Sequence, residues 1–299
     1  GIFIPFNAQS STGAVTVGLG AKGVIEVQLI SSGEKWGRGP AKDIHSSLMA
    51  SVDNPAWRLV KALATLVKDD GYTPAIDGWF DNVKPLTERQ KEIIRSEVAG
   101  SDEKEEMKAL GLKRWIADED FLTASYRLAS QPTVNIQGLV SGYTGPGGKT
   151  ILPGRAEAKL DFRLVPDMTY DEAVAKLKAH LAKRGFGDIE VVVSGGYGPN
   201  ETTEDSALIR AQQATLKAAG IEQSLAARMA GSWPGVLFTG EPLKMAAGMF
   251  GGGIGGGAHA PNEWILIDSS NPKLLGFDGQ ALLYADFLYE VARAGKRKR

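Results

Sequence analysis

The sequence predicts an α/β protein built around a β-α-β-β-α-β unit, the ferredoxin-like or split βαβ arrangement of an α+β domain. Two observations carry this prediction: segments that alternate apolar and polar residues occur four times, and capped amphipathic helices follow the first and third of them. A polar, helix-rich stretch at 72–131 lies between the two halves of the pattern and is expected to be a helical insertion.

The first half of the unit follows a lead-in rich in Ser, Thr and Gly, in which a short strand at 15–19 is allowed. Residues 24–30 alternate apolar and polar side chains and are predicted to form a half-buried strand. A helix is expected from Asn54, a good N-cap residue, to a stop at Gly71.

The second half begins after the insertion, which itself opens with a capping box at Thr87-x-x-Gln90. Alternating segments at 133–138 and 156–164 flank a turn rich in Gly and Pro, and they predict an antiparallel pair. A second capping box, Thr169-x-x-Glu172, opens a helix that Gly185 ends, and the final strand is expected at 188–193.

The predicted secondary structure changes near residue 198. A helix capped by Thr202, an apolar strand at 264–267 and a terminal helix at 279–294 follow, with few strands for a sheet of their own. This segment is expected to be part of a domain whose other half lies elsewhere. The expected division of the chain is 1–19, 20–197 and 198–299.

Composition excludes several functional classes. The 299 residues carry a formal net charge of -1, which gives no general attraction to nucleic acid or anionic membranes. Cysteine is absent, so disulfides, thiolate metal sites and cysteine nucleophiles are excluded. Because no apolar run approaches about 20 residues and no signal peptide opens the chain, a soluble, cytoplasmic protein is predicted.

Three segments partly match the residue pattern of a known motif but lack a residue or the structural context that the motif requires. Gly147-Gly-Lys-Thr150 lacks the upstream glycine of a phosphate-binding loop and leads into a strand. The spacing Gly251-x-Gly253-x-x-Gly256 precedes a strand instead of following one, as a dinucleotide site would require. Ser232 lacks the first glycine of a serine-hydrolase elbow.

The most conspicuous stretch is the glycine run at 251–257, which ends just before His259 and Glu263. So many glycines suggest a backbone that approaches something closely. His259 is a candidate metal ligand, although one histidine cannot form a metal site alone.

Three other residues are candidates by their type and position. His45 lies in a polar loop beside Asp43 and two serines, where a functional role and a structural one both remain open. His180, on the lysine-rich side of a helix, is expected to be a solvated or edge residue. Arg163 projects from the polar face of its strand, either to act at a site or to form a cross-strand ion pair.

Six fragments, taken together and in order, carry a family resemblance. The chain resembles the co-catalytic zinc metallopeptidases of family twenty, which include carnosinase-type dipeptidases, acetylornithine deacetylase and succinyl-diaminopimelate desuccinylase. The matching fragments are Asp43-Ile-His45-Ser46, Asn54-Pro55, Lys149–Pro153, Arg163–Pro166, Gly231–Pro234 and His259–Glu263.

The resemblance implies a catalytic α/β domain with two zinc ions, interrupted by a ferredoxin-like lid that forms a homodimer. Residues 20–197 would be the lid, and 1–19 and 198–299 parts of the catalytic domain. The resemblance also implies roles for single residues. His259 would be a zinc ligand, and Glu263 would support its loop. Ser232 would contact substrate, Thr150 and Arg163 would anchor the substrate carboxylate, and His45 would act in the partner subunit's active site.

The chain departs from the family pattern in its metal ligands. A His-x-Asp motif, a Glu-Glu pair and a further acidic ligand have no match in residues 1–23, so His259 is the one ligand retained and the chain alone is not expected to hold two zinc ions. The predicted function is hydrolysis of an amide bond in a dipeptide or N-acyl amino acid by a longer enzyme of which this is a portion. A separate N-terminal fragment is then an additional candidate partner, and a non-catalytic dimerisation or binding module is the alternative.

Overall fold

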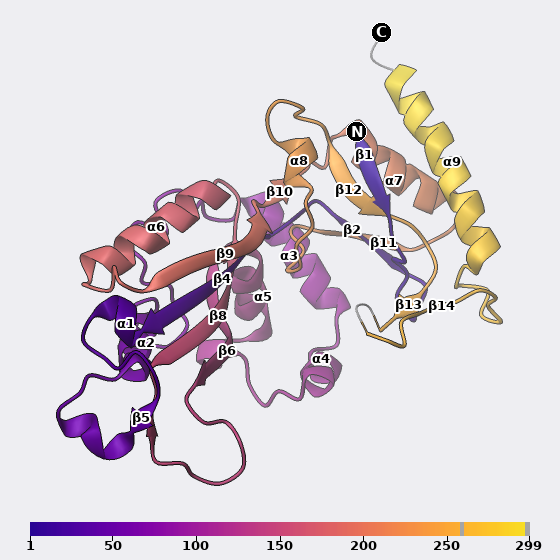
Figure 1. Ribbon diagram of the computed structural model, residues 1–299. Coiled ribbons are helices and arrows are strands. Elements are labelled where there is room, and N and C mark those ends of the chain that lie inside the picture. The colour runs from indigo at the N-terminus through magenta and orange to yellow at the C-terminus, as the bar shows by residue number, and fades with distance from the viewer. Residues whose placement is uncertain (258–259, 297–299) are drawn as a thin grey trace. The chain divides into compact units, whose positions relative to one another are not determined.

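The computed structural model of the protein describes residues 1–257 and 260–296, with side chains described up to 294 (Figure 1). The chain forms two compact units, each built from separate stretches of sequence. Unit 1 comprises 1–22, 85–130 and 200–299, and unit 2 comprises 23–84 and 131–199.

Unit 2 is a four-stranded antiparallel sheet with two helices, as the alternating segments predict. The strand order is β6-β8-β4-β9, which is the order of a ferredoxin-like β-α-β-β-α-β unit. Its elements are β4 (Gly23–Ser32), α2 (Pro55–Ala64), β6 (Thr133–Ser141), β8 (Arg155–Leu164), α6 (Tyr170–Lys183) and β9 (Glu190–Tyr197).

Local capping sets the helix starts in unit 2. The Asn54 side chain accepts the Ala56 backbone N–H at 2.7 Å, and Thr169 caps α6 through the Glu172 N–H. Helix α2 ends at Ala64 and not at Gly71, and the N–H and hydroxyl of Thr65 both donate to the Ala62 carbonyl at this end.

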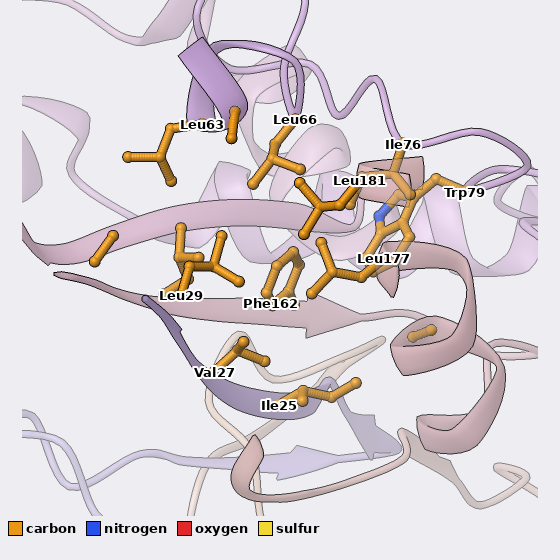
Figure 2. Packing of buried hydrophobic residues seen from close by; sticks show 14 of the residues in the cluster. Ile25, Val27, Leu29, Leu63, Leu66, Ile76, Trp79, Phe162, Leu177 and Leu181 are labelled. Atoms are coloured by element: carbon orange, nitrogen blue, oxygen red, sulfur yellow. The ribbon is translucent and has the colours of Figure 1, made fainter. Parts of the chain in front are cut away.

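The core of unit 2 lies between the helices and one face of the sheet. Figure 2 shows Phe162 of β8 among leucines of α6 and of the segment after α2. The Trp79 ring packs on Phe162 with 5.5 Å between centroids. Alternate residues of β4 and β8 supply the rest of this layer, which is why both strands have a two-residue apolar period.

His180 is buried, so the expectation of a solvated or edge residue was wrong. Its Nδ1 accepts the Asp77 backbone N–H at 3.1 Å, and its Nε2 lies 3.1 Å from the Thr65 hydroxyl. Burial is the main cause that lowers the pKa of His180. The imidazole therefore ties α6 to the segment after α2, while Lys178 and Lys183 of the same helix are exposed.

Smaller elements of unit 2 extend from its sheet. A short helix, α1 (Gly33–Trp36), continues directly from β4, and a second strand pair joins β5 (Ile44–His45) to β7 (Ile151–Leu152). A 3-10 helix, η1 (Ser46–Ala50), follows β5.

Unit 1 contains short strand pairs covered by helices (Figure 1). Two pairs are parallel: β1 (Ile2–Pro5) with β12 (Ala247–Phe250), and β2 (Val15–Gly18) with β11 (Gln223–Ala226). Two are antiparallel: β3 (Gly20–Ala21) with β10 (Asn200–Glu201), and β13 (Gly255–Gly256) with β14 (Trp264–Ile265). The helices are α3 (Glu88–Gly100), α4 (Glu103–Leu110), η2 (Ile116–Asp118), α5 (Phe121–Ser130), α7 (Ala207–Ala218), α8 (Val236–Thr239) and α9 (Phe277–Lys296).

The helical stretch inside the expected lid belongs to unit 1 from residue 85 onward. Ile93 and Ile94 of α3 and Ala129 of α5 are buried in one cluster with Val15 of β2 and Leu216 of α7. Residues 72–84 stay with unit 2, so the insertion expected at 72–131 is divided between the two units. Sequence pattern identifies these helices but carries no information on which core receives them.

Two expectations in the last hundred residues need correction. Ser206, and not Thr202, caps α7; Thr202 is buried, and its hydroxyl donates to the Ala247 carbonyl at 2.6 Å and accepts the N–H of the same residue. The apolar run at 264–267 forms only a two-residue strand with an exposed surface.

Within the described residues, no helix combines the length and the apolar character that crossing a membrane requires.

Candidate functional site

His45 and Thr150 are brought together by the small strand pair that extends from unit 2. His45 of β5 lies opposite Ile151 of β7, and the Ser46 N–H donates to the Thr150 carbonyl at 3.2 Å. Both His45 and Thr150 are exposed. The two predicted residues therefore share one solvent-facing extension of the sheet.

The base of this extension is fixed by Asp43. Its carboxylate accepts the Gly154 N–H at 3.0 Å, immediately before β8 begins. Gly154 packs so closely that a Cβ there would lie 2.9 Å from the Lys42 backbone. The loop that carries His45 is thus anchored to the start of β8.

The hydrogen bonds of His45 decide which ring nitrogen carries the proton. The Ser47 backbone N–H donates to His45 Nδ1 at 3.2 Å, and the Ser47 hydroxyl lies 2.8 Å from the same nitrogen. A ring nitrogen that accepts an N–H is unprotonated, so the neutral imidazole holds its proton at Nε2. His45 therefore presents an N–H donor to whatever lies beside the extension.

Arg163 lies on the face of the β8 sheet opposite the helices. Its Nε donates to Asp161 Oδ2 at 3.1 Å along the same strand, and Asn135 of β6 donates to the other carboxylate oxygen at 2.7 Å. Asp161 is buried, with 9% of its side chain exposed, against 34% for Arg163. The ion pair runs along one strand and not across strands, and it orients a partly exposed guanidinium.

Arg163 and Thr150, the two expected anchors of the substrate carboxylate, lie at different places within one copy of unit 2. Thr150 precedes the start of β8, whereas Arg163 is eight residues beyond Arg155, near its end. At about 3.3 Å per residue the two ends of the strand are separated by about 26 Å. Within one copy of unit 2, Arg163 is therefore remote from both His45 and Thr150.

The glycine run packs against its own chain. A Cβ on Gly251 would lie 1.8 Å from the Phe6 carbonyl oxygen, and one on Gly253, whose φ is +70°, would lie 2.0 Å from the Gln280 amide. Only glycine fits at these positions. The close approach expected of this stretch is thus made to the end of β1 and to α9.

Gln9 holds the same stretch in place and has no counterpart among the residues expected from sequence. Its buried amide donates to the Gly13 and Lys273 carbonyls and accepts the Gly253 and Leu275 N–H groups, all at 2.8 Å. A glutamine in a polar lead-in gives no local signal of burial. Its role depends on contacts made across most of the sequence.

The remaining candidates belong to unit 1. Ser232 is half-buried beside Trp233, a member of a small apolar cluster. Glu263 is exposed, and its N–H donates to the Ala260 carbonyl at 3.1 Å in the turn before β14. His259, the predicted metal ligand, lies outside the described residues.

The donor set for a metal can be tested on the described residues. Within them, no three or more His, Asp or Glu side chains converge closely enough to hold a metal ion. The described side chains therefore do not by themselves form a site for a metal ion, and the predicted ligand His259 is not among them.

The class of protein follows from comparison with known families, and the ferredoxin-like order of unit 2 agrees with it. The family model described as "Peptidase dimerisation domain" matches residues 19–188, more than half of the chain. The chain belongs to the M20 peptidase family.

Relatives in this family are named as dipeptidases. The chain is 32% identical over 143 residues to the Beta-Ala-His dipeptidase of Rattus norvegicus, covering 47% of this chain and 28% of that protein. It is 28% identical over 245 residues to the Cys-Gly metallodipeptidase DUG1 of Saccharomyces cerevisiae, covering 78% and 49%.

Solved structures agree in fold. An M20 family metallo-carboxypeptidase of Sulfolobus solfataricus is 35% identical with a TM-score of 0.73, covering 81% of this chain and 61% of that chain. The di-peptidase Dug1p of S. cerevisiae has a TM-score of 0.74 at 23% identity and covers 97% and 58%. The chain thus spans half or less of the curated relatives and about three-fifths of the solved chains.

Proposed function

We propose that this chain is the dimerisation unit and part of the catalytic domain of a metal-dependent dipeptidase. The observation that supports this most strongly is membership of a family whose similar members are named metallodipeptidase and dipeptidase. The proposed reaction is hydrolysis of the amide bond of a dipeptide or N-acyl amino acid, with zinc as the proposed metal. His259 is the proposed ligand from this chain, and the other ligands would come from outside the described residues.

Arg163 is the proposed anchor of the substrate carboxylate. A guanidinium binds a carboxylate through two parallel hydrogen bonds, which fixes the substrate in position as well as neutralising its charge. Asp161, itself held by Asn135, supports this role, because it accepts the Nε–H of Arg163 and the guanidinium stays partly exposed.

His45 is the proposed donor to the oxyanion that develops when the amide is attacked. Its Nε2–H is the free donor side of a ring whose Nδ1 is already held by Ser47. One such donor lowers the barrier by about 3 kcal/mol. His45 lies in the strand pair beside the start of β8 and Arg163 lies near the end of β8, so the proposed site that uses both is formed by two copies of the chain.

Thr150, Ser232 and Glu263 complete the proposal. Thr150 would reach the same site as His45, because one small strand pair carries both residues. Ser232 would contact substrate and Glu263 would support the loop of His259.

A homodimer through unit 2 is proposed, and a cytoplasmic location with it. Among the described residues β6 pairs only with β8, so its outer edge is open. Ile136, Leu139 and Val140 of this strand are about half exposed, and so are Trp57 and Val60 of α2. An open strand edge with apolar side chains is a template for pairing with a second copy. Leu139→Glu should then shift the mass in solution from dimer to monomer, whereas Leu110→Glu on α4 should not.

Steady-state hydrolysis of Cys-Gly and β-Ala-His by the complete, metal-loaded enzyme tests the function. His45→Ala should lower kcat by about 100-fold or more with little change in KM, while His45→Gln keeps a donor and should retain part of the rate. Arg163→Ala should raise KM by about 10- to 100-fold, and Arg163→Lys should recover only part of the loss. An enzyme that dimerises and binds metal but hydrolyses neither substrate would favour the alternative, a non-catalytic dimerisation or binding module.

A further inference from the structure

The segment 228–233, which contains Ser232, is bonded to residues of unit 1 at the points where the chain passes between the two units. The Met229 N–H donates to the Gly20 carbonyl at 2.9 Å, and the Lys22 N–H donates to the Met229 carbonyl at 3.2 Å. The backbone at Met229 is therefore fixed by the last residues before the first such crossing. The four crossings follow Lys22, Lys84, Ser130 and Pro199.

Arg228 is a buried cation that contacts residues beside two further crossings. Only 6% of its side chain is exposed. Its Nη1 donates to the Ala129 carbonyl at 2.5 Å, and its Nη2 donates to Glu201 Oε2 at 3.3 Å. Ala129 lies in the last turn of α5, just before the chain leaves unit 1, and Glu201 follows its return at Asn200. One guanidinium thus joins the two ends of the excursion through 131–199.

The position of Arg228 suits both of its partners. The Ala129 carbonyl is one of the last four of α5, which lack a donor within the helix, and a cation is favourable at that end. Arg228 also neutralises Glu201, whose Oε1 accepts Gln90 Nε2 at 3.3 Å. Gln90 lies in the first turn of α3, soon after the remaining crossing at 84–85. One network around Arg228 and Met229 therefore includes residues beside all four crossings.

The backbone on both sides of Ser232 is held by residues of the same kind. The buried Asn200 donates from Nδ2 to the Trp233 carbonyl at 3.4 Å, and Trp233 is itself buried. Before the segment, the Glu97 carboxyl of α3 accepts the Ala227 N–H. Both α3 and α5 thus contact the chain just ahead of Ser232, which gives the helices of 85–130 a connection to a proposed site residue.

We propose that Arg228 is a positioning residue for Ser232, and that the helices of 85–130 serve the reaction by fixing the loop that contacts substrate. The proposal rests on the proposed function, in which Ser232 contacts substrate. Arg228 itself does not touch the substrate and acts through the backbone that leads to Ser232. Misplacing a substrate-contacting group by about 1 Å can lower the rate by about 100-fold, so a residue remote from the reaction can matter.

A double-mutant cycle in the complete, metal-loaded enzyme tests the proposal, with kcat/KM for Cys-Gly and β-Ala-His as the readout. Arg228→Met should lower kcat/KM at least tenfold. Arg228→Lys keeps the charge but not the planar fork, and should lose less. In a Ser232→Ala background, Arg228→Met should cost less than threefold, because the group that it positions is already absent.

Arg89→Met is the matched control for the loss of an arginine–glutamate pair near a crossing. Arg89 donates to both carboxylate oxygens of Glu204, at 2.9 and 2.7 Å, but 56% of its side chain is exposed. Its replacement should leave kcat/KM within twofold of the wild type. A loss equal to that of Arg228→Met would mean that any ion pair in this region has the same effect, and would overturn the proposal.

Hydrogen exchange of the full chain provides a readout that does not depend on activity. In Arg228→Met the Met229 and Lys22 amides should exchange at least tenfold faster, while the Phe6 amide, bonded to the Phe250 carbonyl, should be unchanged. Unchanged exchange at Met229, an unchanged kcat/KM for Arg228→Met, or additive losses in the cycle would overturn the proposal.

Glu201→Gln is the milder variant and takes the place of Arg228→Met in both experiments if that chain does not fold. It keeps an oxygen acceptor but removes the charge that Arg228 neutralises, and the same outcomes decide. A wild-type enzyme that hydrolyses neither dipeptide would contradict the proposed function alone, because hydrogen exchange decides separately whether Arg228 holds the segment. An active enzyme with additive losses would contradict the role of Arg228 and leave the proposed function standing.

Discussion

Arg58, near the start of α2, holds together the part of unit 2 where α1 and α6 end, and its replacement should cost much of the unit's stability. Its guanidinium donates to both carboxylate oxygens of Asp188 and to the Gly185 carbonyl, and the distance from Nε to Asp188 Oδ2 is 2.9 Å. It also lies between two rings, 4.4 Å from the Trp36 centroid and 4.8 Å from that of Phe186. Only 14% of the Arg58 side chain and 16% of the Asp188 side chain are exposed.

These contacts set the size of the effect. Removing one member of a buried ion pair costs about 3 kcal/mol, because the other charge stays buried without its partner. Each cation–π contact adds about 0.5 kcal/mol. Arg58→Ala should therefore lower the free energy of unfolding by about 4 kcal/mol, which is a fall of about 2 M in the urea midpoint for an m-value of about 2 kcal/mol/M.

Urea unfolding followed by tryptophan fluorescence measures this loss. Arg38→Ala is the matched control, because Arg38 also lies over Trp36 and pairs with a carboxylate, that of Asp53, but is 67% exposed. Its loss should cost no more than about 0.5 kcal/mol. The double variant Arg58→Ala with Asp188→Asn should recover part of the stability. Equal midpoints for the Arg58 and Arg38 variants would refute the reasoning.

Two further predictions concern unit 1. Gly253→Ala should destabilise the chain by about 2 kcal/mol in thermal or urea unfolding, because φ is +70° and a Cβ would overlap Gln280. Gly100→Ala is the control and should stabilise the chain slightly, because Gly100 lies in a helix with open space around it. Equal effects of the two substitutions would contradict the packing described for the glycine run. Burial raises the pKa of Glu97 to about 7 from an ordinary 4.5, against a hydrogen bond from the Ala227 N–H that lowers it. The folded chain therefore retains a proton that the unfolded chain releases, so the stability contributed by Glu97 is complete below about pH 4.5 and is lost as the pH rises through 7. Glu97→Gln should make the thermal midpoint less dependent on pH between 5 and 8, and an unchanged slope would count against a buried Glu97.

Much of unit 2 could be predicted because its signals are local. Alternating residues in 24–30 and 156–164 reflect one buried face, and Asn54 and Thr169 cap helices through groups two or three residues away. The order of elements then gives the ferredoxin-like unit.

What could not be predicted depends on long-range contacts. Residues 85–130 form the expected helices, yet their apolar faces are buried with strands from both ends of the sequence. His180 is surrounded by lysines in sequence but buried in space, and Thr202 has the pattern of a cap but bonds to Ala247.

The candidate site shows the same division. His45, Thr150 and Arg163 were identified by resemblance, and the structure adds that the first two share a strand pair while the third lies at the far end of β8. No local pattern indicates that Gln9 is the residue that fixes the glycine run.

Subunit mixing tests the central claim most directly, namely that His45 of one subunit and Arg163 of the other serve one dipeptidase site. His45→Ala and Arg163→Ala are each prepared in the complete enzyme, where each should be nearly inactive, and are then mixed and allowed to exchange subunits. In a two-fold dimer, half of the mixed population carries one variant of each kind, and each such dimer has one intact site, so activity should return to about a quarter of the wild-type value. Exchange that is confirmed by mass but restores no activity would contradict the account.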